Sequence, residues 1–295
     1  MAKIAFLKGD KPNDISEAYM TAQGLSEIGL DEYTVILYSQ LRITIDKEVA
    51  ITCDGVDLLD FDLVYIRDFQ GYEFERNAVA QYLKQHNKKF LNSDVANFQH
   101  ISKLTQYMTF AFNGLSIPFT VFAKDDELIV AVNEVVGYPT IVKSITGNSG
   151  RDNFLVNDEL ELRRVLSENA GVKFVAQKFI PNNGDLRMIV LGNTVECIYS
   201  RVRQDGDHRN NISQGGDKQY LSLESVDNAH KELAIEAARA VGRDICGVDI
   251  MINSETKSAV ILEANFNFGI RAIPGQLSDE LYGLANFLHE RASQS

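Results

Sequence analysis

Two apolar segments within residues 244–271 most constrain how this chain can fold. In both segments apolar residues recur with the two-residue period of a half-buried strand, and the short polar stretch between them can close the pair as a hairpin. If that loop is symmetric about Thr256, Asp249 lies directly opposite Glu263. Asn265 shares a face with Glu263, because side chains two apart on a strand point the same way. The hairpin therefore places two carboxylates and a carboxamide on one patch.

This patch allows two interpretations. Two carboxylates that face each other in an apolar setting repel unless a cation or a proton lies between them. Oxygen ligands of this kind suit Mg²⁺ or Mn²⁺, which usually also takes substrate phosphates. A plain sheet that leaves three polar groups facing solvent explains the same pattern, and the hairpin alone does not decide between the two.

Composition and charge exclude several classes of protein. A length of 295 residues exceeds the size at which a single core usually stops growing, so we expect two or three lobes. The net charge of −12 argues against a general nucleic-acid binder, which needs a basic surface. No apolar run approaches the roughly 18 residues of a membrane helix, and the N-terminus resembles a first strand rather than a signal peptide. The widely spaced Cys53, Cys197 and Cys246 predict reduced thiols in a cytoplasmic protein without membrane partners.

The first part of the chain has the pattern of an α/β unit with a parallel sheet, because short apolar segments alternate with helical stretches near 15–28 and 73–86. The predicted strands are Lys3–Leu7, Thr34–Tyr38, Leu63–Arg67 and Lys89–Asn92. No Gly-x-Gly-x-x-Gly follows the first strand, so the dinucleotide fingerprint is absent. Arg67 and Asp68 end a strand, where open α/β sheets place ligands. An exposed surface ion pair is the commoner arrangement for such residues.

A helix is predicted between Ser102, which can cap it, and Gly114. Its predicted inner face carries Leu104, Tyr107, Met108 and Ala111. Beyond a second helix at 125–136, two strands enclose a loop with Gly147 and Gly150, and Lys143 lies just before that loop. A loop of this kind can present backbone N–H groups to phosphates. It is not a Walker A loop, and glycine turns in hairpins are common.

Residues 172–203 have the pattern of an antiparallel meander with a tight turn at Gly192 and Asn193. Alternation along the second strand allows Arg187 to face a cleft. The following stretch, 204–216, is too polar for a core, so it is either a disordered or a binding loop. A helix near 233–241, the hairpin, and a closing helix at 276–291 complete the chain.

Taken in order, these motifs resemble the ATP-grasp superfamily, and within it the RimK-type carboxylate–amine ligases, which include ribosomal-protein glutamate ligases and amino-group-carrier ligases. The resemblance covers about residues 100–275 and rests on the set of motifs rather than on any one of them. In chain order the motifs are Lys103, Lys143 before its glycine loop, Gln177-Lys178-Phe179-Ile180, Gly184-Asp185-Leu186-Arg187, Arg209-Asn210-Asn211, Gln214-Gly215-Gly216, Gly247-Val248-Asp249 and Leu262-Glu263-Ala264-Asn265.

The resemblance implies an α/β (α+β) ATP-grasp fold in three parts. Residues 1–95 would form the N-terminal pre-ATP-grasp α/β domain, residues 96–180 the central lid subdomain, and residues 181–295 the C-terminal subdomain with the metal site. The family precedent also favours a homo-oligomer, either a dimer or a tetramer.

The resemblance also implies a role for each matching residue. Asp249, Glu263 and Asn265 would hold one or two Mg²⁺ or Mn²⁺ ions, in agreement with the geometry of the hairpin. Arg187, Arg201 and Arg209 would lie near the reacting centre. The residues that would contact ATP are Lys103, Lys143, Gly147, Ser149, Gly150, Gln177, Lys178, Phe179, Ile180, Asp185, Asn210 and Asn211. Among these the hinge 177–180 would hold adenine through backbone groups, and Asp185 would bind the ribose hydroxyls.

Three departures from the family pattern concern specificity. Lys178 stands where the RimK hinge usually has an acidic residue. Thr146-Gly147-Asn148-Ser149-Gly150 replaces Glu-Gly-Thr-Gln-Gly, and Phe266-Asn267-Phe268-Gly269 replaces Ser-Ser-Pro-Gly. Because the last segment helps to shape the acceptor site, the identity of the acceptor does not transfer from the family.

The implied reaction is phosphorylation of a carboxylate by ATP, followed by attack of an amine on the acyl phosphate. The partners would be an amino-acid or peptide carboxylate and an amine acceptor, for which a peptide or protein terminus is one candidate. Two alternatives remain at this point: a kinase on the same fold that phosphorylates a hydroxyl, and a non-catalytic ATP-binding regulatory protein. The complete set of matching site residues argues against the second.

Overall fold

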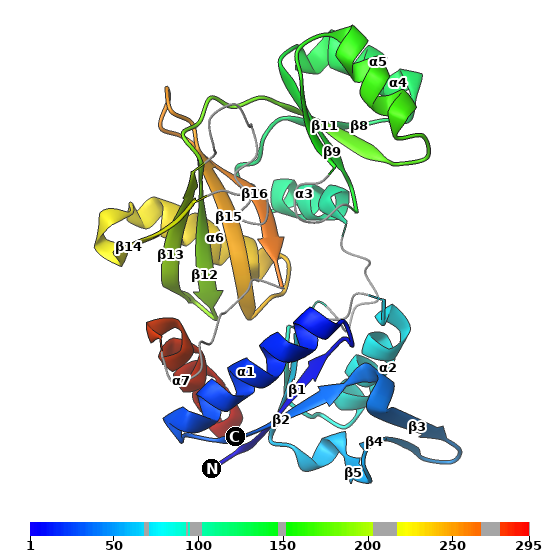
Figure 1. The fold of residues 1–295 in the computed structure, drawn as a ribbon, viewed down its shortest axis with the longest axis vertical. Helices are drawn as coiled ribbons and strands as arrows, with labels where there is room; N and C mark the ends of the chain where they lie inside the picture. The colour runs from blue at the N-terminus through cyan, green and yellow to red at the C-terminus, as the bar shows by residue number, and fades with distance from the viewer. Residues whose placement is uncertain are drawn as a thin grey trace.

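The computed structural model describes residues 1–67, 71–92, 94, 102–146, 152–202, 217–266 and 278–294, apart from the side chains of 12–15, 17, 202, 217 and 218. Figure 1 shows three units one above another: an N-terminal unit that contains both termini, a middle unit built on a large sheet, and an upper unit, called the lid below. Among the described helices, none combines the length and apolarity needed to cross a bilayer.

The N-terminal unit contains the predicted parallel sheet. Its strands are β1 (Lys3–Lys8), β2 (Glu32–Leu37), β6 (Leu63–Ile66) and β7 (Phe90–Leu91), in the order β2-β1-β6-β7. Its helices are α1 (Pro12–Ile28) and α2 (Glu73–Gln85). Side chains of β1 enter two separate cores on alternate sides, Phe6 with Leu25 of α1 and Leu7 with Val79 of α2. Burial on both faces explains why residues 4–7 of β1 are all apolar rather than alternating.

Two details of this unit differ from the sequence prediction. A second, three-stranded antiparallel sheet was not predicted; it consists of β3 (Leu41–Ile45), β4 (Val49–Cys53) and β5 (Val56–Asp57). Arg67 is buried, with 2% of its surface exposed, so the interpretation of Arg67 as an exposed surface charge is wrong. Asp68 lies outside the described residues. Cys53, Cys197 and Cys246 are free thiols, as expected.

The lid is a four-stranded antiparallel sheet covered on one face by two helices. Helix α3 (Lys103–Phe112) precedes the lid and packs against the middle unit. The elements of the lid are β8 (Thr120–Phe122), α4 (Asp126–Ala131) with a π-helical continuation (Val132–Val136), β9 (Thr140–Ser144), β10 (Asn153–Val156), α5 (Glu159–Glu168) and β11 (Phe174–Lys178), and the strand order is β10-β9-β11-β8. The hydroxyl of Ser102 accepts from the N–H of Thr105 (3.2 Å), which confirms the predicted cap of α3. Apolar residues of α4, α5 and the sheet form a core that belongs to the lid alone.

The middle unit is a five-stranded antiparallel sheet with the order β14-β13-β12-β15-β16. Its elements are β12 (Asp185–Leu191), β13 (Thr194–Val202), β14 (Asp217–Leu221), α6 (Asn228–Ala240), β15 (Ile245–Ile252) and β16 (Ala259–Asn265); α7 (Asp279–Ser293) closes the chain and lies beside α1 (Figure 1).

The predicted meander over 172–203 is wrong in its first strand. β11 pairs with β9 and β8 in the lid, whereas β12 pairs with β13 and β15 in the middle sheet. The residues between them, Pro181 to Gly184, form a linker between two sheets rather than a turn within one. Proline lacks the N–H that a central ladder requires, which explains the break.

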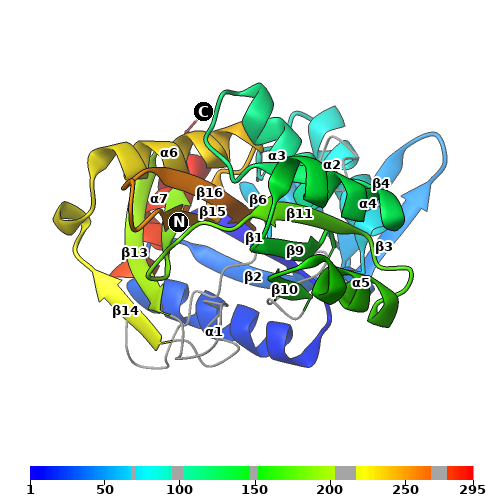
Figure 2. The ribbon, with the colours of Figure 1, turned by 90° about the horizontal axis from the view of Figure 1, so that it is seen from above.

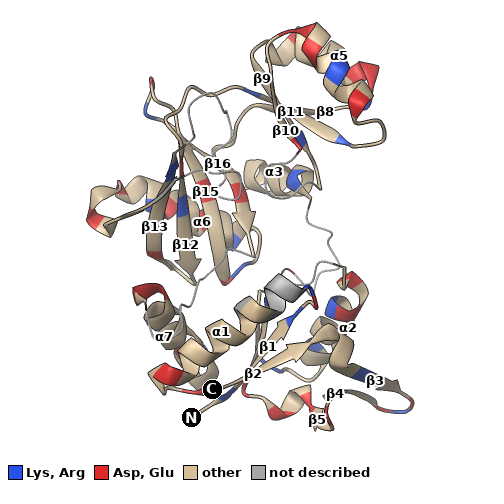
Figure 3. Cartoon of the chain, in the orientation of Figure 1, with Lys and Arg blue, Asp and Glu red and all other residues tan. Residues whose placement is uncertain are grey.

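The two faces of the middle sheet have different partners. One face is apolar along its length and packs against α3 and α6, with Met188, Val248 and Ile250 in that core. At one end of the other face, Ile189 and Tyr199 pack in a second core together with β1 and α7. The rest of this second face carries charged residues, and Figure 3 shows acidic and basic positions together on β12, β13, β15 and β16. The packing of α7 and the N-terminal unit therefore leaves one polar area on the sheet.

Helix α3 presents a face that differs in part from the one predicted. Tyr107 is buried and Leu104 packs against the core, as predicted, whereas Met108 and Ala111 are exposed and Gln106 and Phe110 are buried in their place. Gln106 points inward because its carboxamide binds the edge of β16, and a buried polar group is tolerated when it is hydrogen-bonded.

Candidate active site

The hairpin of β15 and β16 pairs Asp249 with Glu263, as predicted. The register shifts by one residue between Asp249 and Ile250, because Ile250 pairs with Ile261 and leaves Leu262 as the extra residue of a bulge. Asn265 pairs with Gly247, two positions further along the same face. The two carboxylates and the carboxamide therefore share the polar area of the middle sheet.

Two arginines from neighbouring strands bind Asp249. Arg187 on β12 donates from Nε to Asp249 Oδ1 (2.6 Å) and from Nη2 to Oδ2 (2.7 Å). Arg201 on β13 places Nη2 at 2.9 Å from Asp249 Oδ2. Arg201 is itself held by Asp185, to which it donates from Nε (2.6 Å) and Nη2 (2.8 Å). Arg201 thus bridges two carboxylates, and Arg187 binds the carboxylate of Asp249 through two hydrogen bonds.

Glu263 and Asn265 form the other half of the patch. Nζ of Lys103, the first residue of α3, lies 3.4 Å from Glu263 Oε1. With its amide oriented so that both ends find partners, Asn265 donates from Nδ2 to Glu263 Oε1 (3.2 Å) and accepts from Nη2 of Arg187 (3.2 Å). In this orientation the amide oxygen of Asn265 also lies 3.4 Å from Asp249 Oδ2. A continuous polar network therefore connects β12, β15, β16 and α3.

The electrostatics of the patch favour the charged form of Asp249 and a readily titrated Lys143. Burial alone would raise the pKa of Asp249, but the guanidinium groups of Arg187 and Arg201 outweigh it and hold this pKa below its ordinary value. Burial, together with the ammonium of Lys103, lowers the pKa of Lys143 on β9 to about 8, although Glu263 opposes the shift. The pKa of Lys143 therefore depends on Lys103 of α3 and on the carboxylates of the hairpin.

The described residues of the predicted hinge are held by the lid sheet. The carboxamide of Gln177 is buried; it donates to Thr120 Oγ1 (2.8 Å) and accepts from the hydroxyl of Tyr107 (3.5 Å). The carbonyl of Gln177 accepts from the hydroxyl of Thr140 (2.8 Å). Lys178 ends β11 with an exposed side chain, and Phe179 and Ile180 follow with half-buried side chains.

Asp185 has a partner that sequence analysis did not predict. Both of its carboxylate oxygens bind Arg201, and the residue is buried. Asp185 therefore positions an arginine, and its role toward ribose hydroxyls stays a prediction.

Six further predicted site residues, Gly147, Ser149, Gly150, Arg209, Asn210 and Asn211, lie outside the described residues. The fold brings eight of the predicted site residues together: Lys103, Lys143, Asp185, Arg187, Arg201, Asp249, Glu263 and Asn265.

Three residues that sequence analysis did not select fix the position of β16. Gln106 donates from Nε2 to the carbonyl of Ala264 (3.2 Å) and accepts from its N–H (3.1 Å). Tyr107 donates its hydroxyl to the carbonyl of Leu262 (2.9 Å). Arg243 also donates to the carbonyl of Ala264. The available signal was a glutamine inside an otherwise apolar helix face, which indicates a buried polar partner.

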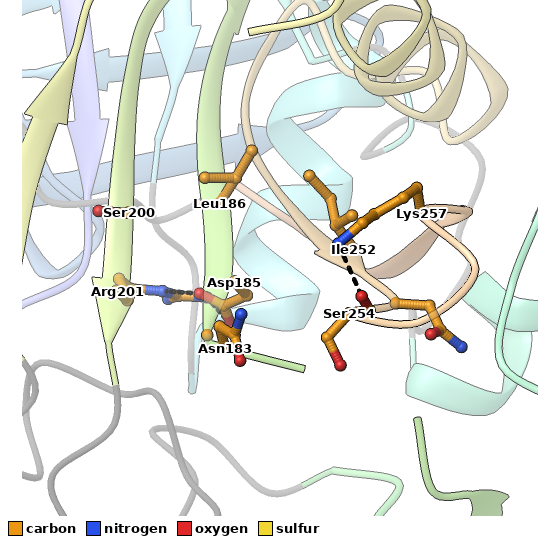
Figure 4. Close-up of a pocket in the computed structure, with 10 residues that line it drawn as sticks. Asn183, Asp185, Leu186, Ser200, Arg201, Ile252, Ser254 and Lys257 are labelled. Atoms are coloured by element: carbon orange, nitrogen blue, oxygen red, sulfur yellow. Dashed lines mark hydrogen bonds and ion pairs between the residues drawn. The ribbon is translucent and has the colours of Figure 1, made fainter. Parts of the chain in front are cut away.

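A cavity of about 260 Å³ lies at the end of the middle sheet, beside this network. Figure 4 shows Asp185 and Arg201 on one side of it, Leu186 and Ile252 on another, and the turn residues Ser254 and Lys257 near its rim. The cavity borders the charged network through Asp185 and Arg201, and its other lining residues come from the linker after β11, from strands β12, β13 and β15, and from the hairpin turn.

The residues of the hairpin fit a hard divalent cation. Within the described chain no group of three His, Cys, Asp or Glu side chains converges on a single metal-sized site. Asp249, Glu263 and Asn265 instead offer two carboxylates and one amide, and such all-oxygen sets suit Mg²⁺, which usually completes its coordination with water and substrate phosphates. The adjacent ammonium groups of Lys103 and Lys143 suit those phosphates.

Comparisons with known proteins identify the family of the chain. The model of the family described as "RimK-like ATP-grasp domain" matches residues 102–281. A protein named probable alpha-L-glutamate ligase from Thioalkalivibrio sulfidiphilus is 26% identical over 98% of this chain and 96% of its own length. A protein of the same name from Pasteurella multocida is 29% identical over 73% of this chain and 69% of its own length.

Solved structures share the fold at low sequence identity. The ATP-grasp ligase PsnB, complexed with a phosphomimetic variant of a minimal precursor, Mg and ADP, has a TM-score of 0.74 at 18% identity and covers 99% of both chains. The macrocyclase MdnC from Microcystis aeruginosa, bound with the precursor peptide MdnA, has a TM-score of 0.69 at 14% identity, with 98% of this chain and 99% of that chain covered. The predicted ATP-grasp fold is confirmed by these likenesses.

Proposed function

The chain belongs to the RimK-like ATP-grasp family, and we propose that it is an ATP-dependent carboxylate–amine ligase. The observation that carries this proposal is the pairing of Asp249 with Glu263 across a hairpin, on a patch that cationic side chains from the lid and the sheet surround. An enzyme that transfers a phosphoryl group needs a patch of this kind, because its main task is to position and neutralise phosphates.

The proposed reaction has two steps. A carboxylate oxygen of the substrate attacks the γ-phosphorus of ATP, the bond from that phosphorus to ADP breaks, and an acyl phosphate forms. The amine of the second substrate then attacks the acyl carbon, the bond to the phosphate oxygen breaks, and the amine loses a proton. The products are an amide, ADP and phosphate. Phosphorylation is required because a carboxylate is a poor electrophile and has no leaving group.

The lysines of the site would bind the nucleotide. Lys103 begins α3 next to Glu263, and Lys143 lies on β9 directly before the glycine-containing loop. From these two sides their ammonium groups would neutralise the phosphates and hold the γ-phosphoryl group over the hairpin. Electrostatic donors of this kind are typically worth about 10²–10³ in rate each.

Asp249, Glu263 and Asn265 would hold Mg²⁺ or Mn²⁺, as one or two ions. The metal would supply further neutralisation of the charge that develops on the phosphates. Arg201, which Asp185 and Asp249 fix in place, would keep the Asp249 carboxylate oriented. Arg187 and Arg209 would face the anionic substrate, since a guanidinium recognises a carboxylate or phosphate through two parallel hydrogen bonds.

Both relatives described above are named probable alpha-L-glutamate ligases, and solved structures of PsnB and MdnC contain precursor peptides. We therefore propose an amino acid or a peptide carboxylate as the acid and an amino acid or a peptide terminus as the amine. We also propose a cytoplasmic homo-oligomer, from the free thiols and from the family resemblance.

The proposal is tested by incubating the protein with ATP, Mg²⁺ and hydroxylamine against a panel of amino acids and short peptides. Hydroxylamine intercepts an acyl phosphate, so only the carboxylate has to be the right one. ADP together with a hydroxamate from one panel member is the expected result. A phosphorylated hydroxyl compound would instead establish a kinase, and no nucleotide binding at all would overturn the assignment of the site.

A further inference from the structure

The guanidinium of Arg187 occupies the centre of the predicted metal site. It contacts both oxygens of Asp249 (2.6 and 2.7 Å) and the amide oxygen of Asn265 (3.2 Å). The third predicted ligand, Glu263, contacts the ammonium of Lys103 instead. Each oxygen group that would bind a divalent cation is thus held by a cation of the protein.

Arg187 and a divalent cation cannot share these oxygens without cost. Both carry positive charge, and two charges a few ångströms apart interact strongly where water is largely excluded. The Asp249 side chain is only 7% exposed and that of Arg187 15%, so solvent screens little of this repulsion. A cation that takes Asp249 and Asn265 as ligands therefore opposes the contacts of Arg187.

The two arginines at Asp249 differ in how firmly they are held. Arg201 makes two bonds to Asp185 in addition to its contact with Asp249, and its side chain is 4% exposed. Among the described residues Arg187 makes no hydrogen bond to a second carboxylate and feels Asp185 only through its charge; its other hydrogen-bond partners there are the neutral Asn265 and the hydroxyl of Tyr199. Loss of Asp249 would leave Arg201 anchored, whereas it would release Arg187.

We propose that Arg187 and a divalent cation compete for Asp249 and Asn265, so that cation binding releases the Arg187 guanidinium for an anionic group of the substrate. This inference rests on the proposed function, because the metal site belongs to it. The Arg187 guanidinium binds the metal ligands first, and then the carboxylate or the acyl phosphate of the substrate. Since the released charge must be met by an anion, Mg²⁺ alone binds poorly and binds well together with ATP.

The test measures Mn²⁺ binding, by the loss of the free-ion electron paramagnetic resonance signal, without nucleotide. Four proteins are compared: the wild type, Arg187→Gln, Arg187→Lys and the control Arg239→Gln. Arg239 is an exposed residue of α6 that bonds to Asn193, so its substitution removes the same charge outside the polar patch. We expect Arg187→Gln to bind Mn²⁺ at least tenfold more tightly than the wild type, Arg187→Lys to be intermediate, and Arg239→Gln to be unchanged.

Equal or weaker Mn²⁺ binding by both Arg187 variants overturns the inference. If Arg187→Gln does not fold, judged by circular dichroism, Arg187→Lys decides, because lysine keeps the charge but loses the fork that grips both oxygens. A parallel Mn²⁺ titration in the presence of a non-hydrolysable ATP analogue shows whether only the competition by Arg187 is wrong or the proposed function is wrong as well. Mn²⁺ binding by the wild type with the analogue supports the proposed site; absence of that binding overturns the site and the inference together.

Discussion

At the scale of single residues, Leu262 decides which side chains reach the polar patch. Beyond the turn, Ile250 pairs with Ile261, but Asp249 pairs with Glu263, because Leu262 is inserted as a bulge. Without this extra residue the register would slip by one, and a slip of one residue turns a strand side chain to the opposite face. Sequence analysis predicted the correct partner of Asp249 from an assumed symmetric loop, but periodicity cannot reveal a bulge.

The first prediction concerns Glu263. Glu263→Gln keeps the shape of the side chain and removes the charge that Lys103 and a metal would share, so we expect kcat to fall by about 10²–10³-fold. The matched control is Glu255→Gln, an exposed residue of the hairpin turn, which should retain wild-type turnover. Wild-type turnover of Glu263→Gln would remove Glu263 from the metal site.

A second prediction follows from the lowered pKa of Lys143. A lysine with a pKa of about 8 is charged below that pH and loses its charge as the pH rises through it. Affinity for a non-hydrolysable ATP analogue should therefore be constant at lower pH and fall above about pH 8, because phosphates need the ammonium form. Lys143→Arg stays charged over this range, so its profile should be flat. Identical pH profiles for the two proteins would contradict this role.

At the scale of elements, helix α3 closes the open edge of the middle sheet. β16 is an edge strand, and such a strand exposes unpaired N–H and C=O groups. Gln106 supplies both a donor and an acceptor to Ala264, in the manner of a neighbouring strand. Ala264 stands between Glu263 and Asn265, so this contact fixes two predicted metal ligands at once.

The corresponding prediction uses Gln106→Met, which preserves length but leaves the N–H of Ala264 buried without a partner. We expect the free energy of unfolding to fall by about 1–3 kcal/mol, as determined by urea denaturation. Gln23→Met provides the matched control, because Gln23 on α1 is exposed and bonds only to Glu27 among the described contacts. Its unfolding free energy should change by less than about 0.5 kcal/mol. Equal effects of the two substitutions would show that Gln106 does not support β16.

The sequence predicted most elements but placed some of them wrongly. The order of strands and helices, the cap of α3 and the parallel N-terminal sheet are confirmed, since periodicity and caps are local signals. The predicted meander was wrong because strand pairing depends on contacts between residues far apart in the sequence, and Pro181 separates two sheets. The inner face of α3 was predicted correctly at Leu104 and Tyr107 only, because a polar residue was assumed to point outward, although Gln106 has buried partners.

At the scale of the whole molecule, the N-terminal unit and the middle sheet share one core. Phe6 of β1, Ile189 of β12 and Leu284 of α7 belong to the same cluster, whereas Leu162 of α5 belongs to a core confined to the lid. Figure 2 shows α5 on the opposite side of the molecule from α7. Segments that share a core unfold together, so the lid should be a separate unit of stability.

This division predicts different outcomes for two matched substitutions. Leu284→Ala and Leu162→Ala each remove a fully buried leucine side chain, at a cost of about 2–5 kcal/mol. Native-state hydrogen exchange should accelerate in β1 and β12 for Leu284→Ala, and in β9 and β10 for Leu162→Ala. Uniform acceleration throughout the chain in both variants would mean that the three units unfold as one.

Transfer of oxygen from the carboxylate tests the proposed ligase reaction most directly. The acid identified with hydroxylamine is labelled with ¹⁸O in its carboxyl group, and the phosphate released during amide formation is examined by mass spectrometry. An acyl phosphate keeps the attacking carboxylate oxygen on phosphorus when the amine displaces it, so we predict one ¹⁸O atom in the phosphate for each amide formed. Unlabelled phosphate, or a stable phosphorylated product without an amide, would contradict a carboxylate–amine ligase.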